Sequence, residues 1–329
     1  MKWLVSKVSI QKPSTSAQLS LAEALAKTDA IFGRERSLVV SDPSAIVSYF
    51  TQSEWAYSLY HSDADCIHLA INEDGKFSPE GYYVHPRYIA QQIDSLNAKS
   101  VLEVGCGKGF NSRYLAEQFS SVNFLGLDLT PLHVEIARQK SKVFKNLSFQ
   151  TGDFNAIPFA SNSVDIVFGV ETLCYAKDTS LLFKEMHRVL RPGGQLIVFD
   201  AFGNAPPSTW PADIQAAVKL TEVSMVVEHG FAPMAQWLEA ARSAGFQVSL
   251  HKNLTFAVRP GLLRLQSLAQ RFFRVRLRAR LLQWLSPQYL VRNAIAGLLM
   301  PYVFLPAESP IGYFQIALTK AVDPHNLPV

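Results

Sequence analysis

The stretch VLEVGCGKGFNSRYLAEQF, residues 101–119, places three glycines directly after an apolar run and directly before a helical pattern. The run SVLEVG at 100–105 combines β-branched and apolar residues, which favours a buried strand. Gly105, Gly107 and Gly109 free the backbone for a tight turn, and the first N–H groups of the following helix lack intrahelical partners. The stretch therefore predicts a strand, a turn that a ligand can approach closely, and a helix.

The chain repeats this alternation after residue 100. Further strand-like runs lie at 122–128, 147–153, 164–170, 194–200, 246–253 and 312–319, and segments with helical apolar spacing separate most of them. Such repetition predicts an α/β fold with a Rossmann-like, seven-stranded, mostly parallel sheet and helices on both faces. The motif RPGG at 191–194 predicts a tight turn from a helix into a strand.

Four regions follow from the pattern. Residues 1–99 are expected to form a helical lid, with helices near 16–32, 43–60 and 86–97. Residues 100–254 are expected to form the core, with 201–231 as a cap insertion. A basic helical cap insertion is expected at 255–310, and the last strand and tail at 311–329. The additions should gather at the carboxyl ends of the strands, where open α/β sheets bind ligands.

Composition narrows the class of protein. The chain has 329 residues, 48% of them hydrophobic, which suits one main domain with additions. Lys7 interrupts the apolar opening, and the longest later apolar run is broken by proline, so neither a secretory signal nor a transmembrane helix is expected. The cysteines Cys66, Cys106 and Cys174 lack metal-ligand spacing and are expected to be reduced thiols, which favours a cytoplasmic protein without a metal site.

The glycine turn departs from a dinucleotide fingerprint, because Phe110 stands where the third glycine of G-x-G-x-x-G is needed. Asp128 ends the second predicted strand, 19 residues after Gly109, where an acid can accept hydrogen bonds from ribose hydroxyls. Asp153 ends the third predicted strand and can receive an exocyclic amine. These positions indicate a nucleoside ligand rather than a pyrophosphate.

The motifs EVGCGKG, LGLD, GDFNAIPF, VDIVFGVETLCYA and HRVLRPGGQLIV, in order between about 100 and 200, resemble those of class I S-adenosylmethionine-dependent methyltransferases. The resemblance implies that S-adenosylmethionine is the cofactor and S-adenosylhomocysteine the product. It also implies an antiparallel last strand, which 312–319 would supply. The residues that the resemblance assigns to the cofactor are Glu103, Gly105, Gly107 and Gly109 around the methionine part, Asp128 on the ribose, and Leu129, Asp153 and Phe154 around the adenine.

A narrower likeness lies outside the common core. VETLCYA at 170–176 is similar to the E-x-x-C-H-A stretch of sterol C-methyltransferases, with Tyr175 in place of histidine. LYHSDADCIHLA at 59–70 resembles their F-Y-E-W-G-W-G-x-S-F-H-F-A segment at Tyr60, His68 and Ala70, but lacks its tryptophans and glycines. We interpret this as kinship with the methyltransferases of sterols, tocopherols and similar lipophilic molecules.

The predicted reaction moves a methyl group to carbon, or in second place to oxygen, of a hydrophobic isoprenoid, sterol-like, quinone or polyketide-like molecule. Glu171 is the candidate to stabilise a carbocation, although it would otherwise only bind cofactor or cap a helix. His68 is the candidate base for a hydroxyl acceptor, or else satisfies a loop hydrogen bond. The tyrosines expected to line the pocket are Tyr60, Tyr82, Tyr83 and Tyr175. Two alternatives stay open: an N- or O-methyltransferase of a polar metabolite, and a cofactor-binding protein without methyl transfer.

Charge is distributed unevenly. Residues 240–307 hold ten Lys or Arg and no Asp or Glu, so the rest of the chain carries −6 against +4 for the whole. Within them, 262–285 would place Leu265, Leu268, Phe272, Val275, Ala279 and Leu282 on one stripe of a single helix. This segment is either a capping helix or an interfacial helix on an anionic membrane surface. A nucleic-acid partner is not expected, and the oligomeric state is not predicted.

Overall fold

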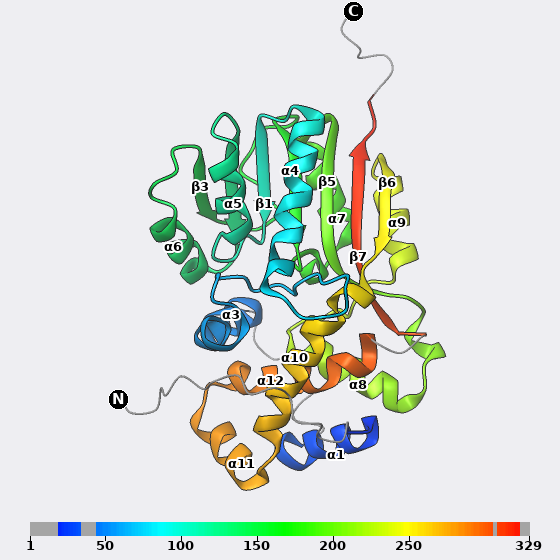
Figure 1. Cartoon of the computed structure of the whole chain (residues 1–329). Coiled ribbons are helices and arrows are strands. Elements are labelled where there is room, and N and C mark those ends of the chain that lie inside the picture. Colours follow the sequence, from blue (N-terminus) through cyan, green and yellow to red (C-terminus); the bar gives the residue numbers. More distant parts are fainter. Residues whose placement is uncertain (1–18, 34–43, 305–307, 323–329) are drawn as a thin grey trace, which may run out of the picture.

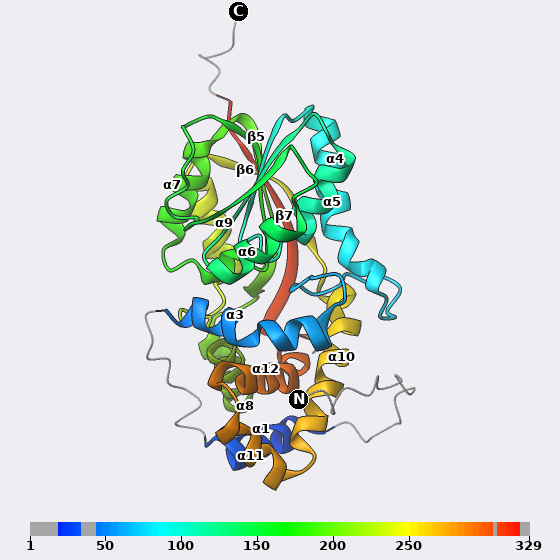
Figure 2. The ribbon, with the colours of Figure 1, turned by 90° about the vertical axis from the view of Figure 1, so that its left-hand side faces the viewer.

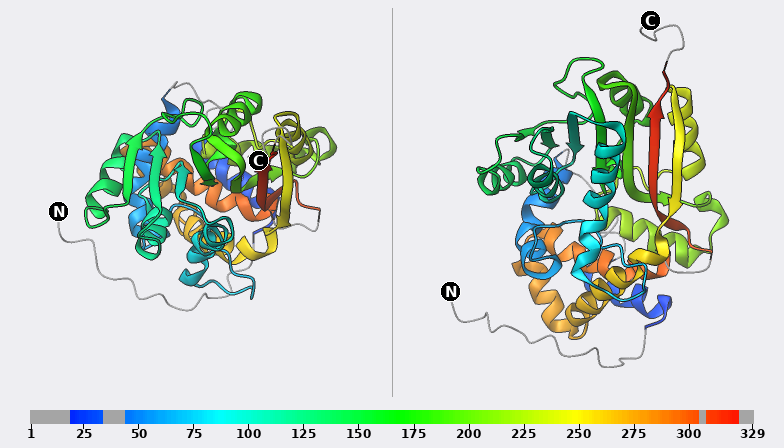
Figure 3. Two further views of the ribbon diagram at one scale, coloured as in Figure 1. Left: turned by 90° about the horizontal axis from the view of Figure 1, so that it is seen from above. Right: turned by 45° about the horizontal axis from the view of Figure 1, so that its top comes forward.

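The computed structural model describes residues 19–33, 44–304 and 308–322, and its centre is a seven-stranded sheet in the order β3-β2-β1-β4-β5-β7-β6 (Figure 1). The strands β1 to β5 are parallel, and β7 is antiparallel to both β5 and β6. Figure 3 shows β7 in red between β5 and β6. Their bounds are β1 Ser100–Val104, β2 Asn123–Asp128, β3 Leu147–Thr151, β4 Val164–Val170, β5 Leu190–Gly203, β6 Phe246–Asn253 and β7 Ile311–Lys320. The predicted fold class is confirmed, including the antiparallel last strand.

Helices cover both faces of the sheet, as Figure 2 shows. One face carries α4 (Val84–Leu96) and α5 (Phe110–Gln118), and the other carries α7 (Thr179–Val189) and α9 (Met234–Ser243), while α6 (Pro131–Lys140) packs on β2 and β3. Successive side chains of a strand point to opposite faces, so in β4 Ile166 and Phe168 join one buried cluster and Val167 joins the other. Burial on both faces explains the nearly continuous apolar runs in the sequence.

The RPGG motif turns the chain within the first part of β5. Val164 of β4 pairs with Leu190, but Ile166 pairs with Gln195, so residues 191–194 bulge out of the ladder. Gly193 has φ 77°, a left-handed conformation that glycine adopts at low cost.

The helical additions form a second body at the carboxyl ends of the strands, below the sheet in Figure 1. Its central helix is α12, which packs against α3, α8 and α10 and is buried on nearly all sides. The helices of this cap are α1 Leu21–Phe32, α3 Ala45–Ala56, α8 Ala212–Ser224, α10 Thr255–Phe273, α11 Arg276–Leu285 and α12 Gln288–Phe304. A π-helix, Tyr57–His61, continues α3, and a 3-10 helix, Pro79–Tyr83, leads into α4. Residues 16–18 of the first predicted helix lie outside the described residues.

The prediction of one helix over 262–285 is wrong. The helix α10 ends at Phe273, Val275 is extended with φ −121° and ψ 102°, and α11 starts afresh at Arg276. The break lets α11 fold back, so that Ala279 is fully buried. It also lets the Arg278 guanidinium donate to the Arg271 carbonyl near the end of α10, at 2.6 Å. The expected stripe is therefore split between two helices.

No helix in the described part of the chain combines the length and apolar character needed to cross a membrane.

Candidate functional site

A single cavity of about 1310 Å³ lies between the carboxyl ends of the strands and the helical cap. Its floor is the turn after β1 together with the ends of β2 and β4, and its roof comes from α3, α10, α11 and α12. This position is the one at which open α/β sheets bind ligands. The cavity volume exceeds that of a typical drug-sized ligand site and has room for two reactants side by side.

The glycine turn requires glycine for steric reasons. Gly107 has φ 51°, and a Cβ there would lie 2.7 Å from Ile67 Cδ1. Gly109 has φ 76°, and a Cβ there would lie 2.5 Å from the ring of Phe149. Gly105 and Gly107 line the cavity, whereas Gly109 lies outside it and packs α5 on β3. Gly109 therefore shapes the turn without forming its surface.

Asp128, at the end of β2, bridges the glycine turn and the backbone after β2. Its Oδ2 accepts the Gly107 N–H at 2.8 Å and its Oδ1 accepts the Thr130 N–H at 2.7 Å. Each carboxylate oxygen has a second lone pair, which leaves acceptors for hydroxyls in the cavity. The neighbouring Leu129 also lines the cavity and is 43% exposed, so it offers an apolar face to a planar ring.

Glu103, near the carboxyl end of β1, lines the cavity and is buried. Its carboxyl group accepts from Asn111 Nδ2 at 2.9 Å and from the backbone and side chain of Ser112. Burial raises the pKa of Glu103 to about 7, in spite of these hydrogen bonds. Asp153 and Phe154 line the cavity beyond β3, and Asp153 Oδ1 accepts from the Asn155 backbone and side-chain amides.

Glu171 follows β4 with φ 52°, a left-handed conformation that is costly for a residue with a Cβ. Its N–H donates to the Phe199 carbonyl at 2.7 Å, which holds this turn against β5. Its Oε1 accepts from the Leu69 N–H at 2.7 Å and from the Tyr313 hydroxyl at 3.0 Å. Burial, followed by the nearby charge of Asp200, raises the pKa of Glu171 to about 8.

His68 belongs to a buried group of three histidines. Its Nδ1 lies 3.2 Å from the Leu69 carbonyl, so Nδ1 carries the proton, and Nε2 is a buried acceptor without a partner among the described residues. His61 Nε2 contacts the His68 carbonyl at 2.8 Å, and the rings of His68 and His85 are 4.3 Å apart. Burial lowers the pKa of His61 and of His68 to about 4. His68 is therefore a neutral imidazole at the cavity wall.

The four candidate tyrosines divide. Tyr60 and Tyr175 line the cavity. Tyr82 and Tyr83 do not, and this part of the prediction is wrong. They belong to the 3-10 helix Pro79–Tyr83. The Tyr82 hydroxyl donates to the His61 carbonyl, and Tyr83 packs on Phe110 and Tyr114 of α5. Their side chains are used in holding the lid to α5.

The sequence reasoning missed Asp200 and Tyr313, which both line the cavity. Asp200 Oδ2 accepts the N–H groups of Thr172 and Cys174 at 3.1 and 3.0 Å, and so fixes the turn that carries Glu171. Burial raises the pKa of Asp200 to about 6, and that of the Cys174 thiol well above its ordinary value. Asp200 ends the predicted fifth strand as Asp128 ends the second, which is the signal that would have found it.

The far end of the cavity is apolar. Side chains from three cap helices meet there, and they are Leu265, Leu268 and Phe272 of α10, Leu282 of α11, and Leu290, Val291, Ala294 and Met300 of α12. Arg271 and Arg278 stand at its edge. The cavity thus has an end lined by acidic side chains at the sheet and an apolar end in the cap.

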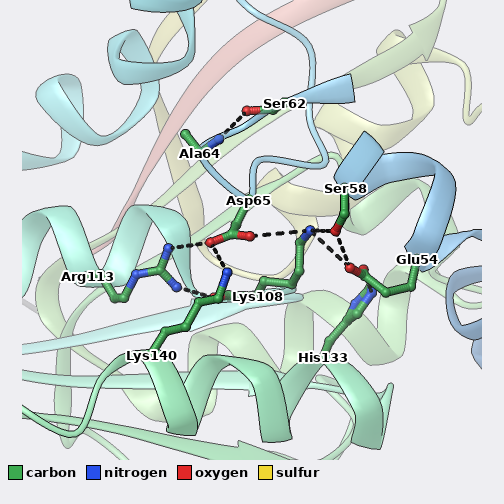
Figure 4. Close-up of polar contacts among 9 residues, drawn as sticks. All are labelled: Glu54, Ser58, Ser62, Ala64, Asp65, Lys108, Arg113, His133 and Lys140. Atoms are coloured by element: carbon green, nitrogen blue, oxygen red, sulfur yellow. Dashed lines mark hydrogen bonds and ion pairs between the residues drawn. The ribbon is translucent and has the colours of Figure 1, made fainter. Parts of the chain in front are cut away.

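A second missed feature is the buried ion cluster beside the turn (Figure 4). Lys108 of the glycine turn is 1% exposed, and its Nζ lies 3.2 Å from Glu54 and 3.6 Å from Asp65. Asp65 also pairs with Lys140 and Arg113, and His133 Nε2 lies 3.3 Å from Glu54 Oε2. These contacts tie α3 and the 62–66 loop to the turn after β1 and to α5 and α6.

The polar groups at the floor of the cavity suit a nucleoside better than a dinucleotide. Carboxylates of Glu103, Asp128 and Asp153 surround the floor, and the one lysine of the turn is occupied by acids of the lid. A pyrophosphate would need cations or free N–H groups at this place, whereas ribose hydroxyls and amines need acceptors.

Comparison with known proteins concerns mainly the core that carries this site. A family model described as a methyltransferase domain matches residues 102–198. The sterol 24-C-methyltransferase erg6 of Aspergillus fumigatus is 32% identical over 179 residues, which cover 52% of this chain and 45% of the relative. The chain spans about half the length of the curated relatives it matches.

Two solved structures share the fold. The cyclopropane synthase MmaA2 from Mycobacterium tuberculosis superposes with a TM-score of 0.68 at 15% identity, covering 85% of this chain and 99% of that one. The cyclase SpnF superposes with a TM-score of 0.65 at 19% identity, covering 84% and 94%. The family match therefore shows a methyltransferase domain over residues 102–198, on a fold that both structures share. Around that domain the chain is similar to sterol C-methyltransferases, in agreement with the resemblance seen in its motifs.

Proposed function

We propose that this protein transfers a methyl group from S-adenosylmethionine to a carbon of a hydrophobic small molecule of the isoprenoid, sterol-like, quinone or polyketide-like kind. The observation that supports the proposal is the joined cavity, which is lined by Glu171, by the glycine turn and by apolar side chains of the cap. Relatives that act on sterol carbon support the same class of acceptor.

In this proposal the sheet end holds the cofactor. Glu103 and the turn at Gly105 and Gly107 would hold its amino-acid part, Asp128 its ribose, and Leu129, Asp153 and Phe154 its base. When bound, the cofactor supplies an electrophilic methyl group. The chain then has to align the acceptor carbon with that methyl group and exclude water, and the cap roofs the cavity for this purpose.

Glu171 is the proposed catalytic group. Methylation of an alkene leaves a positive charge on a neighbouring carbon, and a carboxylate can stabilise that charge and then accept the proton that is lost. The aromatic rings of Tyr57 and Tyr175 also line the cavity and can face a cation. With a hydroxyl acceptor, His68 Nε2 would take the proton instead, since it is a free acceptor on a neutral ring.

The alternatives differ in what they ask of the cavity. A polar metabolite would require hydrogen-bonding side chains in the cap, where α10 and α12 present leucine, valine and methionine. A protein that binds the cofactor without methyl transfer is favoured only by the likeness in fold to the cyclase SpnF.

Labelled S-adenosylmethionine tests the proposal. The purified protein, incubated with it and with fractionated lipid extracts, should give a labelled apolar product and one S-adenosylhomocysteine for each product. Asp128→Asn should weaken cofactor binding in calorimetry by roughly 10- to 100-fold, whereas exposed Asp213→Asn on α8 should bind as the wild type does. Tight cofactor binding without S-adenosylhomocysteine from any fraction would support the non-transferring alternative.

We also propose that α11 rests on an anionic membrane surface, which would make the protein peripheral. Leu277 and Trp284 are 80% and 82% exposed, and Leu281 and Leu285 more than half exposed. In the described part of the chain no carboxylate lies within ion-pair distance of the arginines 271–280, and Leu282 of the same helix lines the cavity. An amphipathic helix with arginines beside leucine and tryptophan suits the headgroup region of anionic lipid.

Vesicle flotation tests this surface. The protein should float with vesicles containing phosphatidylserine at low salt and be released by added salt. Leu277→Ser with Trp284→Ser should abolish flotation, and Val143→Ser, at an equally exposed position beside the sheet, should not. Equal flotation of the three proteins, or none for the wild type, would contradict the proposed surface.

A further inference from the structure

Both hydrogen bonds to the Glu171 carboxyl group fall on one oxygen. Oε1 accepts from the Leu69 N–H and from the Tyr313 hydroxyl, whereas Oε2 has no protein partner among the described residues. Since Glu171 lines the cavity, Oε2 is the atom available to an acceptor molecule. Whether Oε2 can take a proton depends on what holds Oε1.

Tyr313 belongs to β7 and is 1% exposed. Its N–H donates to the Thr255 hydroxyl at the start of α10, which fixes its backbone. Its hydroxyl oxygen lies 3.0 Å from Glu171 Oε1 and 3.3 Å from His85 Nε2. The hydroxyl therefore stands between a carboxyl group and an imidazole.

The protonation of His85 follows from its other contact. Nδ1 of His85 lies 3.4 Å from the Tyr82 carbonyl, which can only accept, so Nδ1 carries the proton and Nε2 is left with a lone pair. Burial keeps the pKa of His85 well below its ordinary value, so the ring is neutral. Tyr313 thus has one proton and two acceptors, His85 Nε2 and Glu171 Oε1.

We infer that the Tyr313 hydroxyl is a positioning group for the proposed catalytic Glu171, donating to Oε1 when Glu171 is a carboxylate and to His85 Nε2 when Glu171 is protonated. This inference rests on the proposed function for its catalytic meaning. Tyr313 stabilises the form of Glu171 that can act as a base, and His85 competes with Glu171 for the same proton.

The other titratable groups around Glu171 would not stabilise its carboxylate, so this role falls to Tyr313. Asp200 of β5 is acidic. The neutral groups whose ionised forms would oppose the carboxylate are Tyr49 of α3, Tyr57 of the π-helix, Tyr82 of the 3-10 helix, and Cys174 and Tyr175 after β4. Neutral His68 of the lid lies beside His85. No lysine or arginine forms an ion pair with Glu171 in the described part of the chain, so two hydrogen-bond donors alone offset its burial.

Two substitutions should shift the ionisation of Glu171 in opposite directions. Tyr313→Phe removes the donor, so the acid limb of the rate against pH should move to higher pH. The rate at pH 7 should fall about 3- to 10-fold and that above pH 9 should stay near the wild-type value. His85→Phe removes the competitor and should move the limb to lower pH. Tyr302→Phe, which deletes a hydroxyl that donates to the Leu19 carbonyl outside the cavity lining, should leave it unchanged.

A readout without turnover separates this inference from the proposed function. The carboxylic C=O band of Glu171, isolated in infrared difference spectra against Glu171→Gln in the cofactor-free protein, should persist to higher pH in Tyr313→Phe and vanish at lower pH in His85→Phe. Band shifts of this kind in a protein that makes no methylated product would refute the proposed function and keep the inference. An unmoved band in Tyr313→Phe, or a rate loss that is equal at every pH, would overturn the inference. If His85→Phe fails to fold, the result for Tyr313→Phe decides.

Discussion

At the scale of single residues, the floor of the site holds more acid than its surroundings can neutralise. Glu103 and Asp200 lie near the carboxyl ends of β1 and β5, Glu171 follows β4, and burial raises the pKa of the three groups to about 7, 6 and 8. Backbone and side-chain donors bond to each of these groups, although Glu171 Oε2 is left without a protein partner, and no ion pair to any of them occurs among the described residues. A cationic or polar ligand would stabilise the charged forms of these three groups, and a sulfonium cofactor or a developing carbocation is such a ligand.

Glu171 should make the fold less stable as pH rises. A carboxyl group that titrates near pH 8 when folded and near 4.3 when unfolded binds more protons in the folded state between these values. The free energy of unfolding therefore falls as pH increases from about 4.5 to about 8. Gln does not titrate. The free energy of unfolding of Glu171→Gln minus that of the wild type should therefore rise by about 2–4 kcal/mol from pH 5 to pH 8.5, measured by urea unfolding.

Glu135→Gln on the exposed face of α6 is the matched control and should show no pH-dependent difference. A difference between Glu171→Gln and the wild type that is the same at both pH values would contradict the raised pKa of Glu171.

Sequence rules found the residues whose position depends on neighbours in the chain. Asp128 could be predicted because the end of a parallel strand always lies at the ligand edge, and the glycine turn was predicted from its spacing. Tyr313 and His85 could not, since the Tyr313 hydroxyl of β7 meets Glu171 across 142 residues of sequence and His85 of α4 across 228. Tyr82 and Tyr83 were misplaced because composition does not say which way a 3-10 helix turns its rings.

At the scale of elements, the lid is attached to the core by charge as well as by packing. Lys108 is on the turn after β1, Glu54 is on α3, and Asp65 is on the loop that follows the π-helix. Burial alone would raise the pKa of Glu54, but hydrogen bonds from His133 and Ser58 and the charge of Lys108 lower it to about 2. A cluster of this kind is sensitive to the loss of any member, because a buried charge is then left without a partner.

A double-mutant cycle should measure this attachment. Glu54→Gln leaves the buried ammonium of Lys108 undercompensated and should lower the free energy of unfolding by about 2–4 kcal/mol, and Lys108→Met combined with it should recover at least ~1 kcal/mol. The exposed pair Glu80–Arg87, at 2.9 Å, provides the control cycle, with a coupling of about 0.2–1 kcal/mol. Equal coupling energies in the two cycles would show that the lid is held by packing alone.

The break between α10 and α11 shows where periodicity stops being informative. Apolar residues continue at helical spacing through 262–285, and no glycine or proline interrupts them. The chain nevertheless turns at Arg274 and Val275, since folding back buries Ala279 and gives the carbonyl of Arg271 a donor from Arg278. Tertiary contacts therefore decide a boundary that local propensity leaves open.

At the scale of the whole molecule, the two bodies divide the work of the site. The sheet supplies the acids and the turn, and its strands could be predicted because each carries its own apolar signal, whereas the antiparallel direction of β7 was implied by the family resemblance. The cap supplies the apolar chamber, and its packing depends on α12, whose buried faces meet α3, α8 and α10. No short motif encodes such a helix, so the sequence predicted that a cap exists without predicting its cavity.

This division predicts that the two ends of the cavity can be altered separately. Ala294 lies on α12 at the apolar end, away from the turn and Asp128. Ala294→Phe adds a ring to that chamber, which should raise the KM of a long hydrophobic acceptor by about 10-fold or more, equivalent to ~1.4 kcal/mol of lost binding. The Kd of S-adenosylhomocysteine, measured by calorimetry, should change less than about twofold, because no cofactor contact is touched. Ala294→Ser keeps the volume and should leave both values near those of the wild type, whereas a parallel loss of cofactor affinity in Ala294→Phe would mean that cap and sheet bind one ligand together rather than two.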